Sequence, residues 1–483
     1  MPDRATSRPL ARADGVRAVL DELGTLDAGR GPLFRRLARA VAAGIERGAL
    51  PRGTRLPAER AMAEGLGVSR GTAVAAYDAL VADGLVERRR GSGTYVLGPG
   101  TLVLPPGREG SLLVHRLVDR SSGPSAVVDL SLSVLDDADG LPDVAVTTAD
   151  LHRIAPDTGY SPWGLAGLRR ALAAHVTAWG LPTTPGQVVV TTGAQQALSA
   201  AAACWVRPGD VVAVDDPTYP GAIAAFTQAG ARLLPMATDG AGVRPDEVAR
   251  ALAQRPALLY LQSGPHSPTG AALPEARRRE VARLVTAARV PLVEDAALAD
   301  LAWAAPSPPP VAAWCEDASV AVVGSLSKVF WGGLRIGFVR APEALALRLA
   351  RVKGTHDLGS SAVAQTMAER LLATGGDDVA ARRRAALRGR YQALAAALRT
   401  HLPAWEWAEP EGGMSLWVRL RGTDATAFAR TALRAGVAVA GPTPLTCAPS
   451  RHPDRLRLAF SPPPPRLEEA VTRLARVWSS LPT

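Results

Sequence analysis

Short, continuous apolar runs recur through the middle of this chain, and segments of helical character separate them. Five such runs begin at residues 188, 211, 258, 291 and 320, and valine and leucine dominate them. A strand that is apolar on both faces must be buried on both faces, which is typical of a parallel sheet covered by helices on either side. The pattern therefore predicts an α/β domain over most of the chain.

A different pattern precedes these runs. Leu33, Leu37, Val41 and Ile45 recur at helical spacing and predict one buried helix face. After a breaker-rich loop, a second short helix is expected over about residues 57–66.

A third helix and a hairpin complete this region. The second helix should end at Gly67, and Ser69 has the character of an N-cap for a helix that runs to about residue 83. Residues 85–96 predict a small hairpin with a glycine tip. The order helix, helix, turn, helix, hairpin is that of a winged helix-turn-helix.

At 483 residues the chain is too long for one ordinary domain. We expect a flexible arm over 1–31, a DNA-binding domain over 32–97, a Gly/Pro/Ser-rich linker over 98–126 and an α/β domain over 127–483. The α/β domain should have a large part at about 150–340 and a small part at about 341–483.

Bulk composition narrows the class of protein. No apolar run approaches the roughly 20 residues of a membrane span, and the first residues lack the apolar core of a secretory signal. Cys204, Cys315 and Cys447 lie far apart and fit neither a metal site nor a disulfide framework, so we expect a reducing cytoplasm and no metal. The formal net charge of +10 permits nucleic-acid binding without requiring it.

Lysine is exceptionally rare. It occurs only at Lys328 and Lys353, so 53 of the 55 basic residues are arginine. A surviving lysine can mark a place where an amine nucleophile is needed, since guanidinium cannot supply one. Survival by chance is the alternative for either lysine taken alone.

Three short motifs of the N-terminal region resemble the GntR family of repressors. They are Leu56-Pro57-Ala58-Glu59-Arg60, Gly67-Val68-Ser69-Arg70-Gly71-Thr72 and Arg90-Gly91-Ser92-Gly93-Thr94-Tyr95-Val96. The region from 32 to 97 carries eleven arginines against six acids, as a reader of double-stranded DNA requires. By this resemblance the DNA contacts would come from Arg60, Ser69, Arg70, Gly71, Thr72, Arg90, Gly91 and Ser92. A merely solvated hairpin face is the alternative for the arginines at 88–90.

The segment Gly324-Ser325-Leu326-Ser327-Lys328, with Gly333-Leu334-Arg335-Ile336-Gly337 after it, places a lysine among hydroxyls and a guanidinium. An amine can react with an aldehyde, while hydroxyls and guanidinium suit a phosphate dianion. The segment resembles the Schiff-base motif of fold-type I enzymes that use pyridoxal 5'-phosphate. By that resemblance Lys328 forms the Schiff base, and Ser325, Ser327 and Arg335 hold the phosphate.

Other segments match the same family in order. The turn at Gly193, Ala194 and Gln195 opens a helix after a strand and would cradle phosphate, while Tyr219 would stack on the ring and Asp295 would hold its nitrogen. Arg457 would grip a ligand carboxylate, and Tyr160 would reach the phosphate of a neighbouring subunit. Separately, Asp295 could be a helix cap, Tyr219 a core aromatic and Arg457 a surface strand residue. Lys353 has no such surroundings and is expected at the surface.

Two groups of the enzymes are missing. Ser267 stands where an asparagine usually donates to the ring's phenolate oxygen, and Ala296-Ala297-Leu298-Ala299 follows Asp295 where a tyrosine commonly lies. His266 or Ser267 could compensate in part. Fewer donors should blunt transamination without preventing cofactor binding.

The whole arrangement resembles the MocR subgroup of GntR regulators. This implies a winged helix-turn-helix fused to a fold-type I transferase-like domain, a DNA operator, a head-to-tail homodimer, no membrane, and sensing of an amine, an amino acid or the cofactor itself. An active aminotransferase with an attached DNA module is the main alternative, and a DNA-binding protein with a vestigial domain is the other.

Overall fold

The structure is a computed structural model, and the chain forms two compact units, Met1–Pro106 and Gly107–Thr483. The described residues are 32–46, 50, 54–82, 85–89, 93–96, 127–135, 140–154, 158–304, 307–315, 319–448 and 451–481. The expected arm and linker lie outside them. Within the described part of the chain, no helix combines the length and the apolar character that a bilayer span requires.

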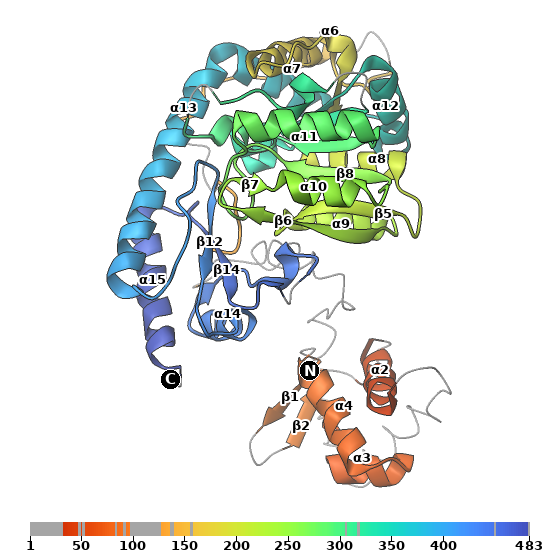
Figure 1. The fold of residues 1–483 in the computed structure, drawn as a ribbon, viewed down its shortest axis with the longest axis vertical. Coiled ribbons are helices and arrows are strands. Elements are labelled where there is room, and N and C mark those ends of the chain that lie inside the picture. The colour runs from red at the N-terminus through yellow and green to blue at the C-terminus, as the bar shows by residue number, and fades with distance from the viewer. Residues whose placement is uncertain are drawn as a thin grey trace, which may run out of the picture. The chain divides into compact units, whose positions relative to one another are not determined.

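The described residues of the N-terminal unit form three helices and a hairpin, in the order of a winged helix-turn-helix (Figure 1). The helices are α2 (Leu33–Glu46), α3 (Glu59–Leu66) and α4 (Arg70–Ala82), and the antiparallel hairpin is β1 (Val86–Arg89) with β2 (Gly93–Val96). The expected elements are confirmed to within a few residues.

Helix α2 buries the expected face, apart from its first member. Leu37, Val41 and Ile45 are fully buried, whereas Leu33 is 37 % exposed, so its expected burial is wrong. A spacing of four residues advances about 40° beyond a full turn each time, which rotates Leu33 by about 120° from Ile45.

Helices α3 and α4 are fixed by local contacts. Gly67 ends α3 in the left-handed conformation, with φ of 64°. The Ser69 side chain accepts a hydrogen bond from the Thr72 amide (3.0 Å), which confirms it as the N-cap of α4. The buried Tyr77 hydroxyl of α4 donates to the Pro57 carbonyl (2.6 Å) and ties the two helices together.

The C-terminal unit is built on an eight-stranded sheet, ordered β4-β11-β10-β9-β8-β5-β6-β7 (Figure 1). The strands are β4 (Val188–Thr191), β5 (Val211–Asp216), β6 (Arg232–Asp239), β7 (Gly242–Val243), β8 (Leu258–Gln262), β9 (Leu292–Asp295), β10 (Val320–Ser325) and β11 (Gly337–Arg340). All five expected strands are present. The sheet is mixed rather than parallel throughout, because β11 runs antiparallel to both β4 and β10, and β7 runs antiparallel to β6.

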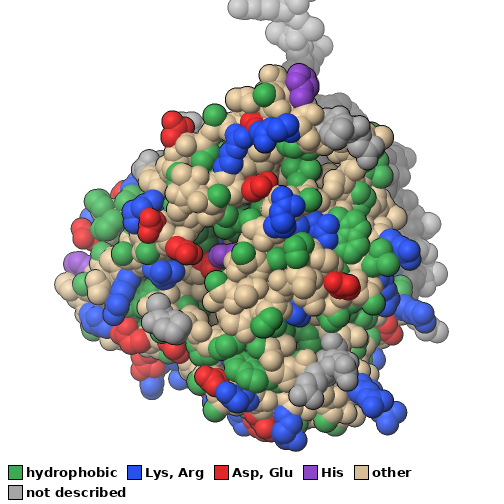
Figure 2. All heavy atoms as spheres, turned by 90° about the horizontal axis from the view of Figure 1, so that it is seen from above, with side chains coloured by type: hydrophobic (Ala, Val, Ile, Leu, Met, Phe, Trp, Pro, Cys, Tyr) green, Lys and Arg blue, Asp and Glu red, His purple; other side chains and the backbone are tan. Residues whose placement is uncertain are grey.

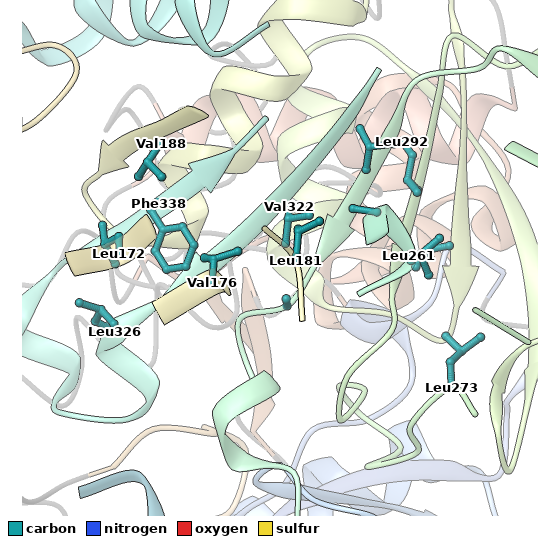
Figure 3. Close-up of a cluster of buried hydrophobic side chains, with 14 of the residues drawn as sticks. Leu172, Val176, Leu181, Val188, Leu261, Leu273, Leu292, Val322, Leu326 and Phe338 are labelled. Carbon is teal, nitrogen blue, oxygen red and sulfur yellow. The ribbon is translucent and has the colours of Figure 1, made fainter. Parts of the chain in front are cut away.

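Helices cover both faces of this sheet. One core includes side chains of α7 (Ala166–Ala178), α10 (Pro245–Leu252), α11 (Glu275–Ala288) and the first half of α13 (Ala362–His401). The other includes α8 (Ala194–Trp205), α9 (Pro220–Gln228) and α12 (Glu343–Asp357). Figure 3 shows the first core, where Phe338 of β11 and Val176 of α7 lie among leucines and valines of the central strands.

A smaller part follows along α13, whose two helical stretches meet at a kink at Gly375 (φ 143°). It contains β12 (Ser415–Arg419), β14 (Arg455–Ala459), α14 (Ala425–Arg434) and α15 (Pro464–Ser479), together with β13 (Val437–Ala438), which pairs with β3 (Val128–Asp129). Its core begins at Leu387 of α13 and also takes in Val128 and Leu130. The start of the C-terminal unit therefore belongs to its smaller part.

Figure 2 shows one face of the C-terminal unit, over the helices at the top of Figure 1. Basic and acidic side chains are interspersed there. Mixed charges produce no field of a single sign, so this face is unlike the basic surfaces that bind nucleic acid.

Lys353 of α12 is 1 % exposed, so its expected place at the surface is wrong. Its amine lies 2.8 and 3.1 Å from the two carboxylate oxygens of Asp357, one turn further along the helix. Asp357 also accepts hydrogen bonds from the Gln196 side chain of α8 (2.8 Å) and the Gly359 amide (3.0 Å). The pair therefore joins α12 to the helix that opens at the Gly193 turn.

Replacing Lys353 by methionine should destabilise the C-terminal unit by on the order of 3 kcal/mol, because Asp357 would lose the partner that compensates its burial. Urea unfolding of the full chain, followed through the transition of this unit, measures the change. The double variant K353M/D357N removes both charges and should recover part of the loss. Equal stability of K353M and the parent protein would contradict this role.

Candidate cofactor site and DNA-reading module

Four of the residues expected to contact DNA lie at the start of α4. Ser69, Arg70 and Gly71 are exposed, and Thr72 is half-buried. Because Ser69 caps the helix, its hydroxyl is already engaged with the amide and hydroxyl of Thr72. The arginine at position 70 therefore projects from a helix start that is fixed in place.

The arginines near α4 fall into two groups. Arg60 makes only an exposed ion pair with Glu64, within its own helix. Arg88 of β1 instead bridges Asp78 of α4 (2.6 Å) and Glu59 of α3 (3.3 Å), so it holds the hairpin to the helices. The expected wing contacts at 90–92 lie outside the described residues.

The turn expected to cradle phosphate has the required shape. Gly193 has φ of 78° and caps α8, whose first residue is Ala194. An added Cβ at Gly193 would lie 2.8 Å from the Arg335 side chain, which donates to the Thr192 carbonyl (3.1 Å). A helix N-terminus beside an exposed guanidinium is well suited to an anion.

Lys328 is the last residue of the short 3-10 turn Leu326–Lys328, which directly follows β10. Ser325 and Ser327 beside it are buried. Burial lowers the pKa of its amine to about 8, with a further contribution from the positive charge of Arg457, while Asp295 opposes the shift. The amine donates to the Ser133 carbonyl (2.7 Å). A lysine with a lowered pKa is a better nucleophile near neutral pH.

Asp295 lies at the end of β9 with both oxygens engaged. One accepts from the Tyr260 hydroxyl (2.8 Å) and the other from the Ala297 amide (2.9 Å). Burial raises the pKa of Asp295, and these two hydrogen bonds oppose the rise by favouring the ionised form. The alternative of a helix cap does not account for the buried tyrosine.

Tyr219 is half-buried at the N-terminus of α9, and its hydroxyl donates to Gln195 (3.2 Å). The Gln195 amide in turn donates to the Gly221 carbonyl (2.9 Å). The charges of Asp295, Arg457 and Arg335 all act on the Tyr219 pKa, which burial raises to about 12. Residues from five separate segments therefore converge on one place.

Arg457 of β14 is 3 % exposed, which excludes a surface strand residue. Its guanidinium donates to the Ser131 carbonyl, and its Nε has no hydrogen-bond partner among the described residues. The buried hydroxyl of Ser133 also lacks a partner there. Unpartnered buried donors are costly unless a ligand satisfies them.

Ser267 and its neighbour His266 lie where the enzymes' missing donor would be. His266 is buried with Nδ1 2.9 Å from the Thr269 hydroxyl and Nε2 3.2 Å from Asp215. The amide and carbonyl of Ser267 are bound by the Gln262 side chain. Nε2 makes no hydrogen bond among the described residues, so compensation by His266 or Ser267 stays a prediction.

Sequence reasoning missed several residues of the site. Tyr260 has the pattern of an ordinary buried strand residue. Its hydroxyl was the available signal, because a tyrosine hydroxyl in a strand buried on both faces needs a hydrogen-bond partner. Ser131 and Ser133 carry no signal, since it is their backbone carbonyls that bind Arg457 and Lys328. Tyr160, expected at a partner's phosphate, is 67 % exposed within the single chain.

The residues present fit pyridoxal 5'-phosphate. The Lys328 amine has a lowered pKa, the Asp295 carboxylate accepts two hydrogen bonds, and the turn at Gly193 suits a phosphate. The buried Nε of Arg457 has no hydrogen-bond partner among the described residues. When bound, this cofactor supplies an aldehyde for an amine and a ring that withdraws electrons.

Comparisons with known proteins agree with both units. Residues 33–96 match the family "Bacterial regulatory proteins, gntR family", and residues 125–474 match "Aminotransferase class I and II". The chain is 28% identical to the HTH-type transcriptional regulator TauR of Rhodobacter capsulatus, over 93% of this chain and 97% of that protein. It is 29% identical to the probable rhizopine catabolism regulatory protein MocR of Rhizobium meliloti, over 80% and 82%.

Among solved structures, the chain resembles the α-aminoadipate aminotransferase LysN of Thermus thermophilus, which was complexed with N-(5'-phosphopyridoxyl)-L-leucine. The TM-score is 0.65 and the identity 26%, over 77% of this chain and 96% of that one. With a GntR-type reader on a class I and II aminotransferase domain, the chain belongs to the MocR subgroup of the GntR family, and its cofactor is pyridoxal 5'-phosphate.

Proposed function

We propose that this DNA-binding transcription regulator senses an amine, an amino acid or the cofactor itself through its aminotransferase-like unit. The observation that carries the proposal is the contact of two site cations with one short segment. Lys328 donates to the Ser133 carbonyl and Arg457 to the Ser131 carbonyl. Any ligand that engages these two cations must compete with those carbonyls.

The roles follow the resemblance residue by residue. Lys328 carries the cofactor, Arg457 receives the effector carboxylate, and the remaining cofactor contacts come from Gly193, Ala194, Gln195, Tyr219, Ser267, Asp295, Ser325, Ser327, Arg335 and Tyr160 of the partner subunit. The exposure of Tyr160 leaves its side chain accessible to a partner, as a head-to-tail homodimer requires. We place this homodimer in the cytoplasm. The DNA contacts are those of Arg60, Ser69–Thr72 and residues 90–92.

The segment that carries the Ser131 and Ser133 carbonyls lies between the effector site and the expected linker in the sequence. Residues 127–135 are the first described residues after the expected linker, 98–126. Leu130 is fixed by backbone hydrogen bonds with Ala438 and Ala459, and Leu135 is buried in the core of the small part, so the contacts with the two cations lie between two anchored residues. A ligand that binds differently to the held and released segment shifts their balance. The linker then passes the change to the DNA reader.

Inefficient turnover fits the same site. Ser267 and the alanines after Asp295 leave the ring oxygen with fewer donors than in the enzymes, and Nδ1 of the adjacent His266 is bound to Thr269. The enzyme alternative needs efficient proton transfers, whereas sensing needs only binding. The vestigial alternative does not explain a poised Lys328 amine or the unpartnered Arg457 Nε.

Operator binding by the full-length, cofactor-loaded protein tests the proposal, with a panel of amines and amino acids added in turn. One compound should change operator affinity and the cofactor's visible spectrum together. Lys328→Ala should lose this response and keep appreciable DNA affinity, because the reader is a separate unit. Rapid multiple turnovers with an ordinary 2-oxo acid, without any effect on DNA binding, would move the protein to the enzyme class.

Arg70→Ala should weaken operator binding and relax base preference, at a cost of about 1–3 kcal/mol for a bidentate base contact. Binding to a randomised DNA library measures the preference. As the comparison, Arg90→Ala should weaken binding to all sequences similarly and reduce its salt dependence. If Arg70→Ala and the parent protein select the same sequences, direct readout by Arg70 is refuted.

The rate of cofactor uptake by cofactor-free protein should rise with pH and level off above about pH 8. The reason is that only the neutral amine of Lys328 is nucleophilic, and burial lowers its pKa to about 8. Stopped-flow absorbance measures the rate, with N-acetyl-lysine as the reference amine. A protein rate that keeps rising to pH 10, as the reference should, would contradict the lowered pKa.

A further inference from the structure

A cavity lined by both parts of the C-terminal unit lies near the expected cofactor residues. Its volume is about 410 Å³, within the range of small-molecule pockets. Pro217 and Thr269 line it from the large part, and Trp417, His452 and Arg455 from the small part. None of these residues belongs to the expected cofactor or DNA contacts.

The cavity shares a sheet face with Arg457. On the paired strands β12 and β14, Trp417 lies opposite Arg457 and Arg419 lies opposite Arg455. Side chains two residues apart on a strand, and those directly opposite on its partner, point to the same face. Arg457 therefore serves the cofactor site, while Arg455 serves the cavity next to it.

Arg455 is the arginine of the wall that forms no ion pair with a described residue, although the carboxylates of Asp454 and Glu406 lie near enough to act on its charge. The other charged side chains of the wall are paired: Asp239 with Arg277, Glu406 with Arg421, Glu409 with Arg399, and Arg419 with Asp454. Arg455 is half-buried, and no ion pair or side-chain hydrogen bond to another described residue engages its guanidinium. A guanidinium in this state favours a carboxylate, which it can bind with two parallel hydrogen bonds.

Aromatic side chains define the rest of the occupant. Trp417 packs edge-on against the His452 ring, with centroids 6.0 Å apart, and Trp407 also lines the cavity. Indole rings supply a flat apolar surface, on which another flat apolar group packs well. The combination matches a small carboxylate with a flat apolar body.

Residues of the cavity wall contact the segments that carry the expected cofactor residues. His452 Nε2 lies 3.5 Å from Asp216, whose other oxygen accepts from the Cys447 amide (3.0 Å), and Asp216 begins the loop that carries Tyr219. Thr269 bonds His266, next to Ser267. An occupant would therefore contact the segments that carry Tyr219, Ser267 and Arg457.

We propose that this cavity is a second ligand site, for a small organic carboxylate with a flat apolar body, and that its occupancy is coupled to the cofactor site. Binding stands independently of the proposed sensing function. The coupling deepens that function, because the regulator would then integrate two ligands.

Binding is tested with benzoate, and with uncharged benzamide of the same shape, on the full chain whose cofactor has been fixed to Lys328 by borohydride. Ligand-observed NMR titration should show benzoate binding, at least tenfold weaker binding of benzamide, and a similar loss in Arg455→Ala. Arg434→Ala removes an exposed charge of the same small part and should leave the dissociation constant unchanged.

Two outcomes overturn the site: equal binding by Arg455→Ala and Arg434→Ala, or a loss that appears only in Arg457→Ala, which would place benzoate at the effector position. Should Arg455→Ala not fold, Arg455→Gln keeps the side-chain stem without the charge. A crystal of the parent protein soaked in 4-bromobenzoate locates the ligand without any variant, and an anomalous bromine signal anywhere but this cavity also overturns the site.

Coupling is tested through the cofactor dissociation constant of cofactor-free protein, with and without saturating benzoate. We expect a change of about fivefold or more, and the same factor for benzoate affinity when the cofactor is loaded. An unchanged constant overturns the coupling. Neither readout uses DNA, so this failure is distinguishable from an operator affinity that ignores every amine.

Discussion

Two buried cations, Lys328 and Arg457, depend on the carbonyls of one short segment for their hydrogen bonds. Removing a charge from water is costly unless fixed dipoles or opposite charges replace the lost solvation. Here the carbonyls of residues 131 and 133 supply dipoles, and Asp295 supplies the opposite charge near Lys328. Asp295 in turn depends on the Tyr260 hydroxyl and a backbone amide. The site is therefore a chain of mutual compensation, and a ligand that engages one member disturbs the others.

The sequence predicted the elements whose pattern is local. Continuous apolar runs located five strands, and the Gly67 and Ser69 signals located the turn between α3 and α4. The antiparallel strand β11 was not predicted, because Gly337–Arg340 is short and directly follows the lysine motif. Pairing direction is a property of the whole sheet, and the apolar runs alone do not encode it.

The same division holds for the site. Lys328, Asp295 and Arg335 were predicted because each lies in a contiguous motif, and the structure brings them together. The contacts that set their chemistry come from distant positions: Tyr260 is 35 residues from Asp295, and Ser133 is 195 residues from Lys328. No spacing rule connects such pairs. They depend on strand order and on the pairing of β3 with β13 in the small part.

The rarity of lysine has a physical explanation in the fold. An exposed positive charge can be arginine, as it almost always is in this chain. Lys328 needs an amine for its chemistry. Lys353 is fully buried between two oxygens of Asp357, where a compact ammonium fits and a planar guanidinium would need more space. Since Asp357 also binds Gln196 in the first turn of α8, the second lysine supports the turn that faces the phosphate. In the proposed function both lysines serve the same site, Lys328 by forming the bond to the cofactor and Lys353 by supporting the turn.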